Sequence, residues 1–370
     1  NAEHSEDAGD YGTATATGTL GGKSFNFELE HQPAYLVFQP YTSNTVLNDC
    51  YLTKIEVTSD NDIAETYTIN TSTDNLDASA GSKQIVLTTG SGFPLTNSSA
   101  SRTTNGAYMI IKSGSHILRV RYWVKDMVTN VEGTITKLLP SIAYASNTYY
   151  DVTADLNVTN YDGNHYYMWD AQQQYWHGYE WTKYLPVGTG QPTLNGNSSP
   201  NYAQNNSDSR WYHEGSGAFQ ATQSCDTLPN ANEMTWYAAS DPRWDADKLW
   251  TTMGHLYKGG MWFKKKAHIS GFNANTAVDG TDWRTTSKNQ NWSASNTLPS
   301  DAEASKYFYL PALGEYGAGK LIRVGSLTHY WSSSANPWNR YEAYGLAFYN
   351  GGVQMGNAVR EYGYRVDGFE

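Results

Sequence analysis

Two loops in the second half of the chain combine the residue types that contact sugars. They run over 282–292 and 336–342, and each mixes tryptophan with amide, acidic and basic side chains. An indole ring offers a flat apolar face to the C–H groups of a pyranose, while Asn, Asp and Arg can hydrogen-bond to its hydroxyls. The pattern therefore predicts a ligand surface with these contact residues: Trp338, Asn339, Arg340, Tyr341, Trp283, Arg284 and Asp282.

The same tryptophans also have a purely structural interpretation. Trp283, Trp292 and Trp331 could be core residues that fasten long loops, and we favour the core for Trp331. Trp338 follows a proline and is flanked by polar residues, so the core and the ligand surface are equally good interpretations there.

Catalytic chemistry has weaker support. A glycosidase needs two carboxylates about 5–10 Å apart across a cleft, and Glu180, Asp282 and Glu342 are candidates only by default. A cysteine hydrolase built on Cys225 would need a matched histidine and an orienting carboxylate. The nine histidines form no recognisable pairing of that kind, so we predict that the protein is not an enzyme.

The chain also lacks metal-binding motifs. There is no His-Glu-x-x-His and no Cys-x-x-Cys, the spacings typical of zinc sites. Asp241, Asp245 and Asp247 could cluster, but acids at that point are better explained by the N-terminus of a helix. Asp60-Asn61-Asp62 lacks the glycine and distal glutamate of a calcium loop and is most simply a turn. We expect no metal and no cofactor.

Composition excludes several classes. The net charge is −11 and neither half is basic, so nucleic acid is not an expected partner. No apolar run approaches the ~18 residues that span a bilayer. Of the 13 tryptophans, Trp123 alone precedes residue 160, and a chain of 370 residues is long enough for two domains. We expect these to cover 1–158 and 159–370.

The first domain has the period-two alternation of strands that are buried on one face. Alternation is clearest over three stretches: 25–29, 118–124 and 150–158. Shorter apolar runs predict strands buried on both faces: Tyr35–Phe38, Ile85–Leu87 and Tyr108–Ile111. Turn residues, among them Gly90–Gly92, separate the runs, and no helix is predicted. An antiparallel β-sandwich follows, and its open sheet edges could accept a strand from another subunit.

The second domain is predicted to be mixed α+β. Asn230 and Glu233 have the spacing of a capping box that starts one helix. A second helix is predicted from about Asp245 to Gly259, with an apolar stripe on one face. A long loop is expected over 188–217, and short strands after residue 306: Tyr307–Leu310, His329–Ser332, Ala343–Tyr349 and Tyr362–Val366.

Several motifs of this half carry a resemblance: Tyr309-Leu310-Pro311-Ala312, Tyr330-Trp331-Ser332-Ser333-Ser334, Ala343-Tyr344, Arg360, and Tyr362-Gly363 with Val366. Together they resemble the Fibrobacter succinogenes major paralogous domain, a branch of the C-type-lectin-like fold shared with formylglycine-generating enzymes. The stretch Cys225–Gly260 is similar to the same domain in Bacteroidales surface adhesins. In those proteins the domain commonly follows a fimbrillin-like β-sandwich, which the first half resembles by pattern.

The resemblance implies a fimbrial tip adhesin at the cell surface or outer membrane. Its sandwich would join other pilus subunits by donor-strand pairing, and its lectin-like domain would bind a glycan or a surface protein. Membrane attachment would require a lipid anchor removed from the N-terminus. Two alternatives stay open: a structural pilus subunit that binds no ligand, and a surface protein that captures polysaccharide for nutrition.

Two departures from the family pattern concern cysteine. Family members often carry Arg-Cys after the last strand, where this chain has Asp367-Gly368, and a second cysteine often lies near the position of Cys225. Formylglycine-generating activity needs a cysteine pair, so we expect none of it here. Cys50 lies in the other half and could pair with Cys225 only if the two domains dock.

Overall fold

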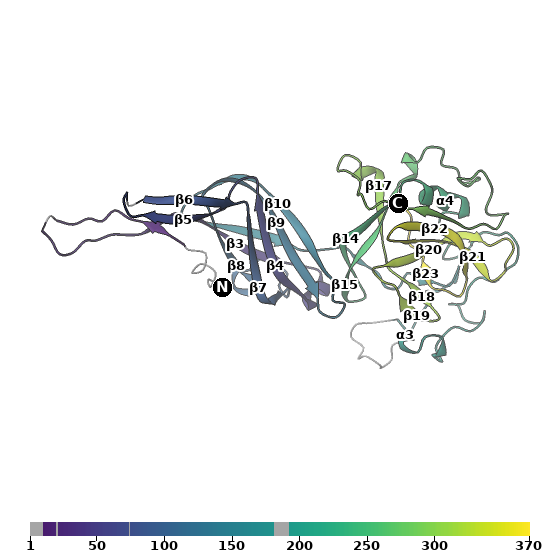
Figure 1. Cartoon of the computed structure of the whole chain (residues 1–370). Helices are drawn as coiled ribbons and strands as arrows, with labels where there is room; N and C mark the ends of the chain where they lie inside the picture. The colour runs from purple at the N-terminus through teal and green to yellow at the C-terminus, as the bar shows by residue number, and fades with distance from the viewer. Residues whose placement is uncertain (1–9, 20, 74, 181–191) are drawn as a thin grey trace. The chain divides into compact units, whose positions relative to one another are not determined.

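The computed structural model describes residues 10–19, 21–73, 75–180 and 192–370, and most of its regular structure is β-strand. The chain separates into two compact units, Asn1–Val158 and Thr159–Glu370. The beginning of the loop predicted over 188–217 lies outside the described residues, up to residue 191. Figure 1 shows the strands of each unit along the chain.

The first unit contains two main sheets. The four-stranded sheet has the order β10 (Glu132–Tyr144), β9 (Gly114–Asp126), β4 (Cys50–Ser59) and β7 (Gln84–Pro94). The three-stranded sheet has the order β11 (Tyr149–Asp155), β3 (Ala34–Tyr41) and β8 (Ala107–Ile111). Phe38 of β3 and Tyr122 of β9 meet edge to face, with ring centroids 6.3 Å apart, so side chains of the two sheets share a core. One pairing differs from the predicted antiparallel arrangement, because β11 runs parallel to β3.

Period-two patterning correctly identified the core face of β9. Leu118, Val120, Tyr122 and Val124 are fully buried, and the residues between them are less so. The prediction of two buried faces is wrong for Ile85–Leu87, because Val86 is exposed. The strand that holds these residues, β7, lies at the edge of its sheet and packs through one face only.

The predicted turn at Gly90–Gly92 is also wrong. The strand β7 continues through it, and Gly90 and Gly92 take positive φ values of 62° and 95°. The pairing register of β7 with β4 shifts between Leu52 and Lys54. Residues 89–92 of β7 thus lie opposite the single residue Thr53 of β4, and the two glycines supply backbone conformations that other residues adopt at a cost.

The stretch 25–29 does not pack on the sandwich as predicted. It belongs to an extended arm closed by β1 (Gly12–Thr13) and β2 (Glu30–His31), with one further bridge between Thr17 and Asn26. Phe25 and Phe27 are both largely exposed. The remaining elements of this unit are the hairpin β5 (Ala64–Asn70) and β6 (Asn75–Ser82), the 3-10 turn η1 (Thr45–Asp49) and the one-turn helix α2 (Arg102–Asn105).

The second unit is built on two larger sheets and a small hairpin. The six-stranded sheet has the order β13 (Tyr166–Tyr167), β23 (Tyr364–Arg365), β20 (Leu327–Ala335), β21 (Glu342–Tyr349), β22 (Gly352–Val359) and β16 (Gln290–Ser293). The four-stranded sheet has the order β12 (Asn160–Tyr161), β14 (Arg243–Thr252), β15 (His255–Lys264) and β17 (Tyr307–Pro311). The small hairpin pairs β18 (Glu315–Gly317) with β19 (Lys320–Ile322). Short helical turns complete the unit: α3 (Pro192–Asn195), η2 (Gly196–Ser198), η3 (Lys266–His268) and η4 (Ala304–Lys306).

The helix α4 (Ala231–Ala239) confirms the capping-box prediction. The Asn230 side chain accepts the N–H groups of Asn232 and Glu233, and the Glu233 carboxylate accepts the Asn230 N–H. Met234 and Ala238 are fully buried in a core that also contains residues of β15, β17, β20, β21 and β22. This helix therefore covers one face of the sheet formed by β20, β21 and β22.

The second predicted helix is wrong, because Arg243–Lys264 forms the hairpin of β14 and β15. The hairpin turns at Met253 and Gly254, which both have positive φ values, 47° and 84°. Two such residues match the two-residue turn whose twist suits paired strands. Asp245, predicted near a helix N-terminus, instead accepts the N–H groups of Asp247 and Lys248 at a register shift in β14.

Candidate functional site

The loop 336–342 connects β20 to β21 and is ordered by one buried side chain. The Oδ1 atom of Asn336 accepts the N–H of Trp338 at 2.9 Å and that of Asn339 at 3.3 Å. Its Nδ2 atom donates to the Glu342 carboxylate at 2.9 Å. In a turn of this kind the asparagine side chain accepts the backbone N–H groups that a neighbouring strand would otherwise accept. The loop therefore has a defined conformation.

This loop exposes two large aromatic side chains. Trp338 is 72% exposed and Tyr341 is 56% exposed. The Arg340 guanidinium lies 5.4 Å from the centre of the Tyr341 ring, within the range of a cation–π contact. Asn339 also belongs to the loop, so the structure brings together four of the seven predicted contact residues.

Arg360 anchors this loop from behind. Its backbone N–H donates to the Tyr341 carbonyl and its Nε atom to the Glu342 carbonyl, both at 2.9 Å. The guanidinium carbon lies 4.6 Å from the centre of the Trp169 ring, and Nη1 donates to the His213 carbonyl. Burial lowers the pKa of Arg360 to about 10. This arginine was noted in the sequence only for its place in a family motif, and it has a positioning role for the loop.

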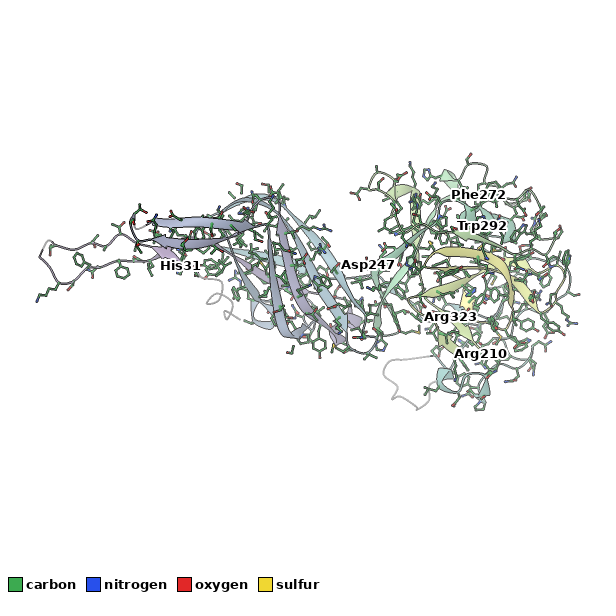
Figure 2. All side chains as sticks on the ribbon, in the orientation of Figure 1. His31, Arg210, Asp247, Phe272, Trp292 and Arg323 are labelled. Atoms are coloured by element: carbon green, nitrogen blue, oxygen red, sulfur yellow. The ribbon has the colours of Figure 1, made fainter. Side chains whose placement is uncertain are left out.

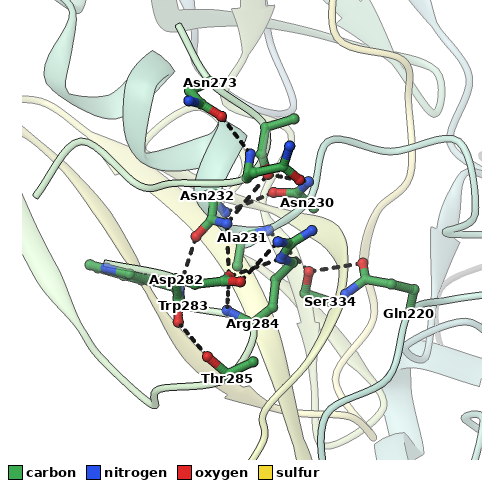
Figure 3. A network of polar contacts seen from close by, with 12 residues as sticks. Gln220, Asn230, Ala231, Asn232, Asn273, Asp282, Trp283, Arg284, Thr285 and Ser334 are labelled. Carbon is green, nitrogen blue, oxygen red and sulfur yellow. Dashed lines mark hydrogen bonds and ion pairs between the residues drawn. The ribbon is translucent and has the colours of Figure 1, made fainter. Parts of the chain in front are cut away.

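The other predicted loop is held in a polar network that Figure 3 shows. Arg284 donates from Nε and Nη2 to the two carboxylate oxygens of Asp282, at 2.9 and 2.8 Å. Asn232 of α4 donates to the same carboxylate at 2.9 Å and accepts the Trp283 N–H at 2.8 Å. The Arg284 hydrogen bonds lower the pKa of Asp282 to about 2. Asp282 and Arg284 thus satisfy each other and fasten the loop to α4.

Trp283 belongs to the core and cannot present its ring to a ligand in this conformation. Its exposed fraction is 0%, and its Nε1 atom donates to both carboxylate oxygens of Asp279 at 3.2 Å. The ring lies 6.0 Å from that of Tyr344. Trp283 is therefore a core residue that holds its loop in place, and Trp331 is likewise fully buried. Figure 2 shows Trp292, which is partly buried against the same core.

Two of the three carboxylates singled out for glycosidase chemistry, Glu180 and Asp282, lack the raised pKa that a general acid needs. Burial acts to raise the pKa of Glu180, but hydrogen bonds from Gly178 and the Glu180 backbone outweigh it and lower the pKa overall. The pKa of Asp282 is lowered as well. Glu342 is occupied by its hydrogen bond with Asn336.

A buried carboxylate that the sequence did not reveal organises the segment around Cys225. Asp170 is fully buried, and its two oxygens accept the backbone N–H groups of Thr222, Gln223 and Cys225 at 2.8–3.1 Å. Its Oδ2 atom also lies 2.7 Å from Nδ1 of His213. Burial raises the pKa of the Cys225 thiol, the opposite of what a nucleophile needs. This constellation is structural, and Cys50 and Cys225 are both fully buried.

Metal-binding clusters and membrane-spanning helices were sought in the part of the chain that the structure describes. No group of three or more His, Cys, Asp or Glu side chains is arranged to hold a metal ion. No helix there has the length and apolar character needed to cross a membrane.

The first unit contains an apolar groove of about 350 Å³ at the edges of its two main sheets. Ile85 of β7 and Ile110 of β8 line it, together with the buried Ile63, the half-buried Tyr67 of β5 and the exposed Lys112. The strands β7 and β8 each end their sheet, so their outer backbone groups have no neighbouring strand in that sheet. Lys112 forms an ion pair with Glu65 at the groove.

Comparison with known protein structures finds partial similarity to cell adhesion and fimbrial proteins of Bacteroides. A Bacteroides fragilis protein, assigned provisionally to cell adhesion, is 15% identical with a TM-score of 0.25, over 36% of this chain and 43% of its own. A Bacteroides ovatus protein with the same provisional assignment is 17% identical with a TM-score of 0.22, over 35% of this chain and 42% of its own. A fimbrial protein of Bacteroides ovatus is 11% identical with a TM-score of 0.17, over 95% of this chain and 73% of its own.

No family model and no curated protein matches the chain. The overlap with the first two Bacteroides structures spans less than half of either of those chains.

Proposed function

We propose that this chain is a fimbrial subunit of the cell surface, in which the second unit is a lectin-like adhesive domain and the loop 336–342 is its ligand-binding surface. One observation carries the proposal: Trp338 is 72% exposed on a loop whose backbone is fixed by buried Asn336. Aromatic side chains held exposed in this way are typical of recognition surfaces, because binding buries them without a large ordering cost. The ligand is a glycan or a surface protein.

The composition of the loop supports this assignment. Asn339 and Arg340 supply hydrogen-bond donors beside the rings of Trp338 and Tyr341, as in sugar sites where apolar faces alternate with polar groups. Trp283, Arg284 and Asp282 are not part of the surface, because the first is buried and the other two pair with each other.

The test is the binding of the full chain to a glycan array and to immobilised extracellular-matrix proteins. We expect signal on at least one class of ligand and its loss in Trp338→Ala. Tyr179→Ala is the matched control, because Tyr179 is an exposed aromatic residue of the same unit at 43% exposure and lies outside the loop. Silence on glycans and matrix proteins alike would refute the adhesin and favour the structural pilus subunit. Growth-linked uptake of a bound polysaccharide would favour the nutritional alternative.

The groove in the first unit supports a second part of the proposal, the attachment to other pilus subunits. An extended segment between β7 and β8 could pair with either edge and place side chains on the half-buried Ile85 and Ile110. Donor-strand pairing therefore fits this groove.

The attachment is tested in cells that assemble the appendage. We expect Ile110→Asp to abolish incorporation of the subunit into surface fibres, seen by immunogold labelling. Leu138→Asp is the control, because Leu138 is 74% exposed on β10 and lies outside the groove. Equal labelling of both variants, with both folded, would refute the groove as the attachment site.

A further inference from the structure

The six-stranded sheet of the second unit carries a small hollow on the face opposite to α4. The hollow, of about 180 Å³, opens over β21 and β22. Its floor contains small residues of both strands, where Gly345 pairs with Gly356 and Ala358 lies two residues further along β22. Ala347 pairs with Gln354 at one end. The opposite side chains of both strands, such as Leu346 and Met355, belong to the core with α4.

Aromatic side chains form a wall beside this floor. Tyr364 is buried, and its ring stacks on that of His329 at 4.3 Å and lies 4.3 Å from that of Trp331. The Tyr364 ring lies over Gly345, where a Cβ atom would be 3.4 Å from it, at ordinary van der Waals distance. Tyr362 is 38% exposed and lies 5.9 Å from Tyr364. The wall is therefore fixed on one side and presents an accessible ring on the other.

The polar side chains that line the hollow carry amide, phenol, imidazole and carboxylate groups. Gln354 and Tyr362 line it, and no hydrogen bond to either side chain occurs among the described residues. His329 is 2.7 Å from the Glu315 carboxylate, and Glu342 also lines the hollow. None of the described residues that line it is Lys or Arg. An anionic ligand would find no Lys or Arg side chain here and would face the Glu342 carboxylate, whereas hydroxyl groups would find the Gln354 amide and the Tyr362 phenol.

We propose that this hollow binds a single uncharged pyranose ring. Its volume lies well below the roughly 300–1,000 Å³ of sites for larger ligands, so it suits one ring and not an extended oligosaccharide. The Tyr362 ring offers an apolar face to the C–H groups of the sugar. The small residues of the floor leave room for the sugar ring, and the Gln354 amide can hydrogen-bond to its hydroxyls. The proposal rests on carbohydrate binding by the second unit and adds a site separate from Trp338.

The test is saturation-transfer NMR on the full chain with four neutral sugars: D-glucose, D-galactose, D-mannose and N-acetyl-D-glucosamine. N-acetylneuraminic acid serves as the anionic comparison. We expect transfer to at least one neutral sugar and none to the anionic one. Ala347→Trp should abolish it by filling the hollow, and Gln354→Ala should weaken binding roughly 2- to 12-fold through loss of one hydrogen bond.

Controls separate this site from the loop. All saturation-transfer measurements are made in the Trp338→Ala background, so that sugar bound at the loop does not contribute. In that background Tyr179→Ala should leave the transfer unchanged, since Tyr179 does not line the hollow. If Ala347→Trp lowers the melting temperature, Tyr362→Ala replaces it as the blocking variant. Absence of transfer from all four neutral sugars, or transfer that survives both blocking variants, overturns the proposal. Array binding that is lost in Trp338→Ala while the hollow stays silent would leave the function of the loop standing.

Discussion

The contrast between Trp338 and Trp283 gives a prediction with opposite outcomes for two similar changes. Both residues were predicted to contact a ligand, yet one is 72% exposed and the other is 0% exposed. Replacing Trp338 by alanine should change ligand affinity and leave the free energy of unfolding within about 0.5 kcal/mol of the wild-type value. Replacing Trp283 should mainly change stability.

The effect on affinity can be worked from exposure. A tryptophan covers roughly 150–250 Å² when fully buried, so the exposed 72% of Trp338 corresponds to about 110–180 Å². A ligand that stacks on one face covers about half of this, or roughly 55–90 Å². At ~25 cal/mol per Å², the loss is about 1.4–2.2 kcal/mol. Trp338→Ala should therefore weaken binding roughly 10- to 40-fold.

The effect of Trp283→Ala follows from burial. Removal of a buried indole leaves a cavity and costs about 3–5 kcal/mol. It also leaves the Asp279 carboxylate without the Nε1–H donor that it accepts at 3.2 Å. Chemical denaturation of both variants measures the change in the free energy of unfolding. Calorimetry with the strongest ligand from the array measures the change in affinity. The reasoning fails if Trp338→Ala destabilises the protein by more than 1 kcal/mol or leaves affinity unchanged, or if Trp283→Ala is as stable as the wild type.

Three further predictions concern structure. Asp170→Ala should destabilise the protein by about 3 kcal/mol or more, because three backbone N–H groups lose a charged acceptor; a loss below 1 kcal/mol in denaturation would contradict the role of this carboxylate. Gly254→Ala should cost about 1–2 kcal/mol in the same assay, since φ is 84° there, and an unchanged midpoint would argue against the turn. The pKa of Asp282 falls from 3.8 to about 2 on folding, so its contribution is complete above pH 3.8 and is lost as the pH drops towards 2. Asp282→Asn should therefore be less stable at pH 5 and lose less stability on acidification, and an acid profile identical to the wild type would refute this.

Features that depend on local chemistry were predictable from the sequence. The helix α4 begins at its capping box, because Asn230 and Glu233 need only each other and the intervening backbone. The strands β9 and β20 contain the stretches predicted for them, since strong patterning survives tertiary packing. The turn at 336–342 likewise rests on Asn336, which reaches only its near neighbours.

The hairpin of β14 and β15 was misassigned because the pattern fits two structures. Leu249, Met253 and Leu256 have helical spacing, and acids before them suit a helix N-terminus. Cross-strand pairing decides in favour of the hairpin, with Trp250 opposite Tyr257 and the turn at Met253 and Gly254. Such pairing is tertiary and overrides weak local preference.

The sequence favoured the core for Trp331, which is buried, but it could not separate the buried Trp283 from the exposed Trp338. Trp283 is buried because α4, which is about fifty residues away in the chain, supplies Asn232 to its backbone. Asp170 and Cys225 are 55 residues apart, so their contact left no local signal. The hollow over β21 and β22 arises from small residues that meet only once the strands pair in register.

The most direct test of the central claim is hydrogen–deuterium exchange of the full chain with and without the ligand that the array selects. Backbone amides of 336–342 should gain protection on binding, and this protection should vanish in Trp338→Ala while persisting in Tyr179→Ala. Protection that appears elsewhere in the chain and leaves 336–342 unchanged would contradict the assignment of this loop as the adhesive surface.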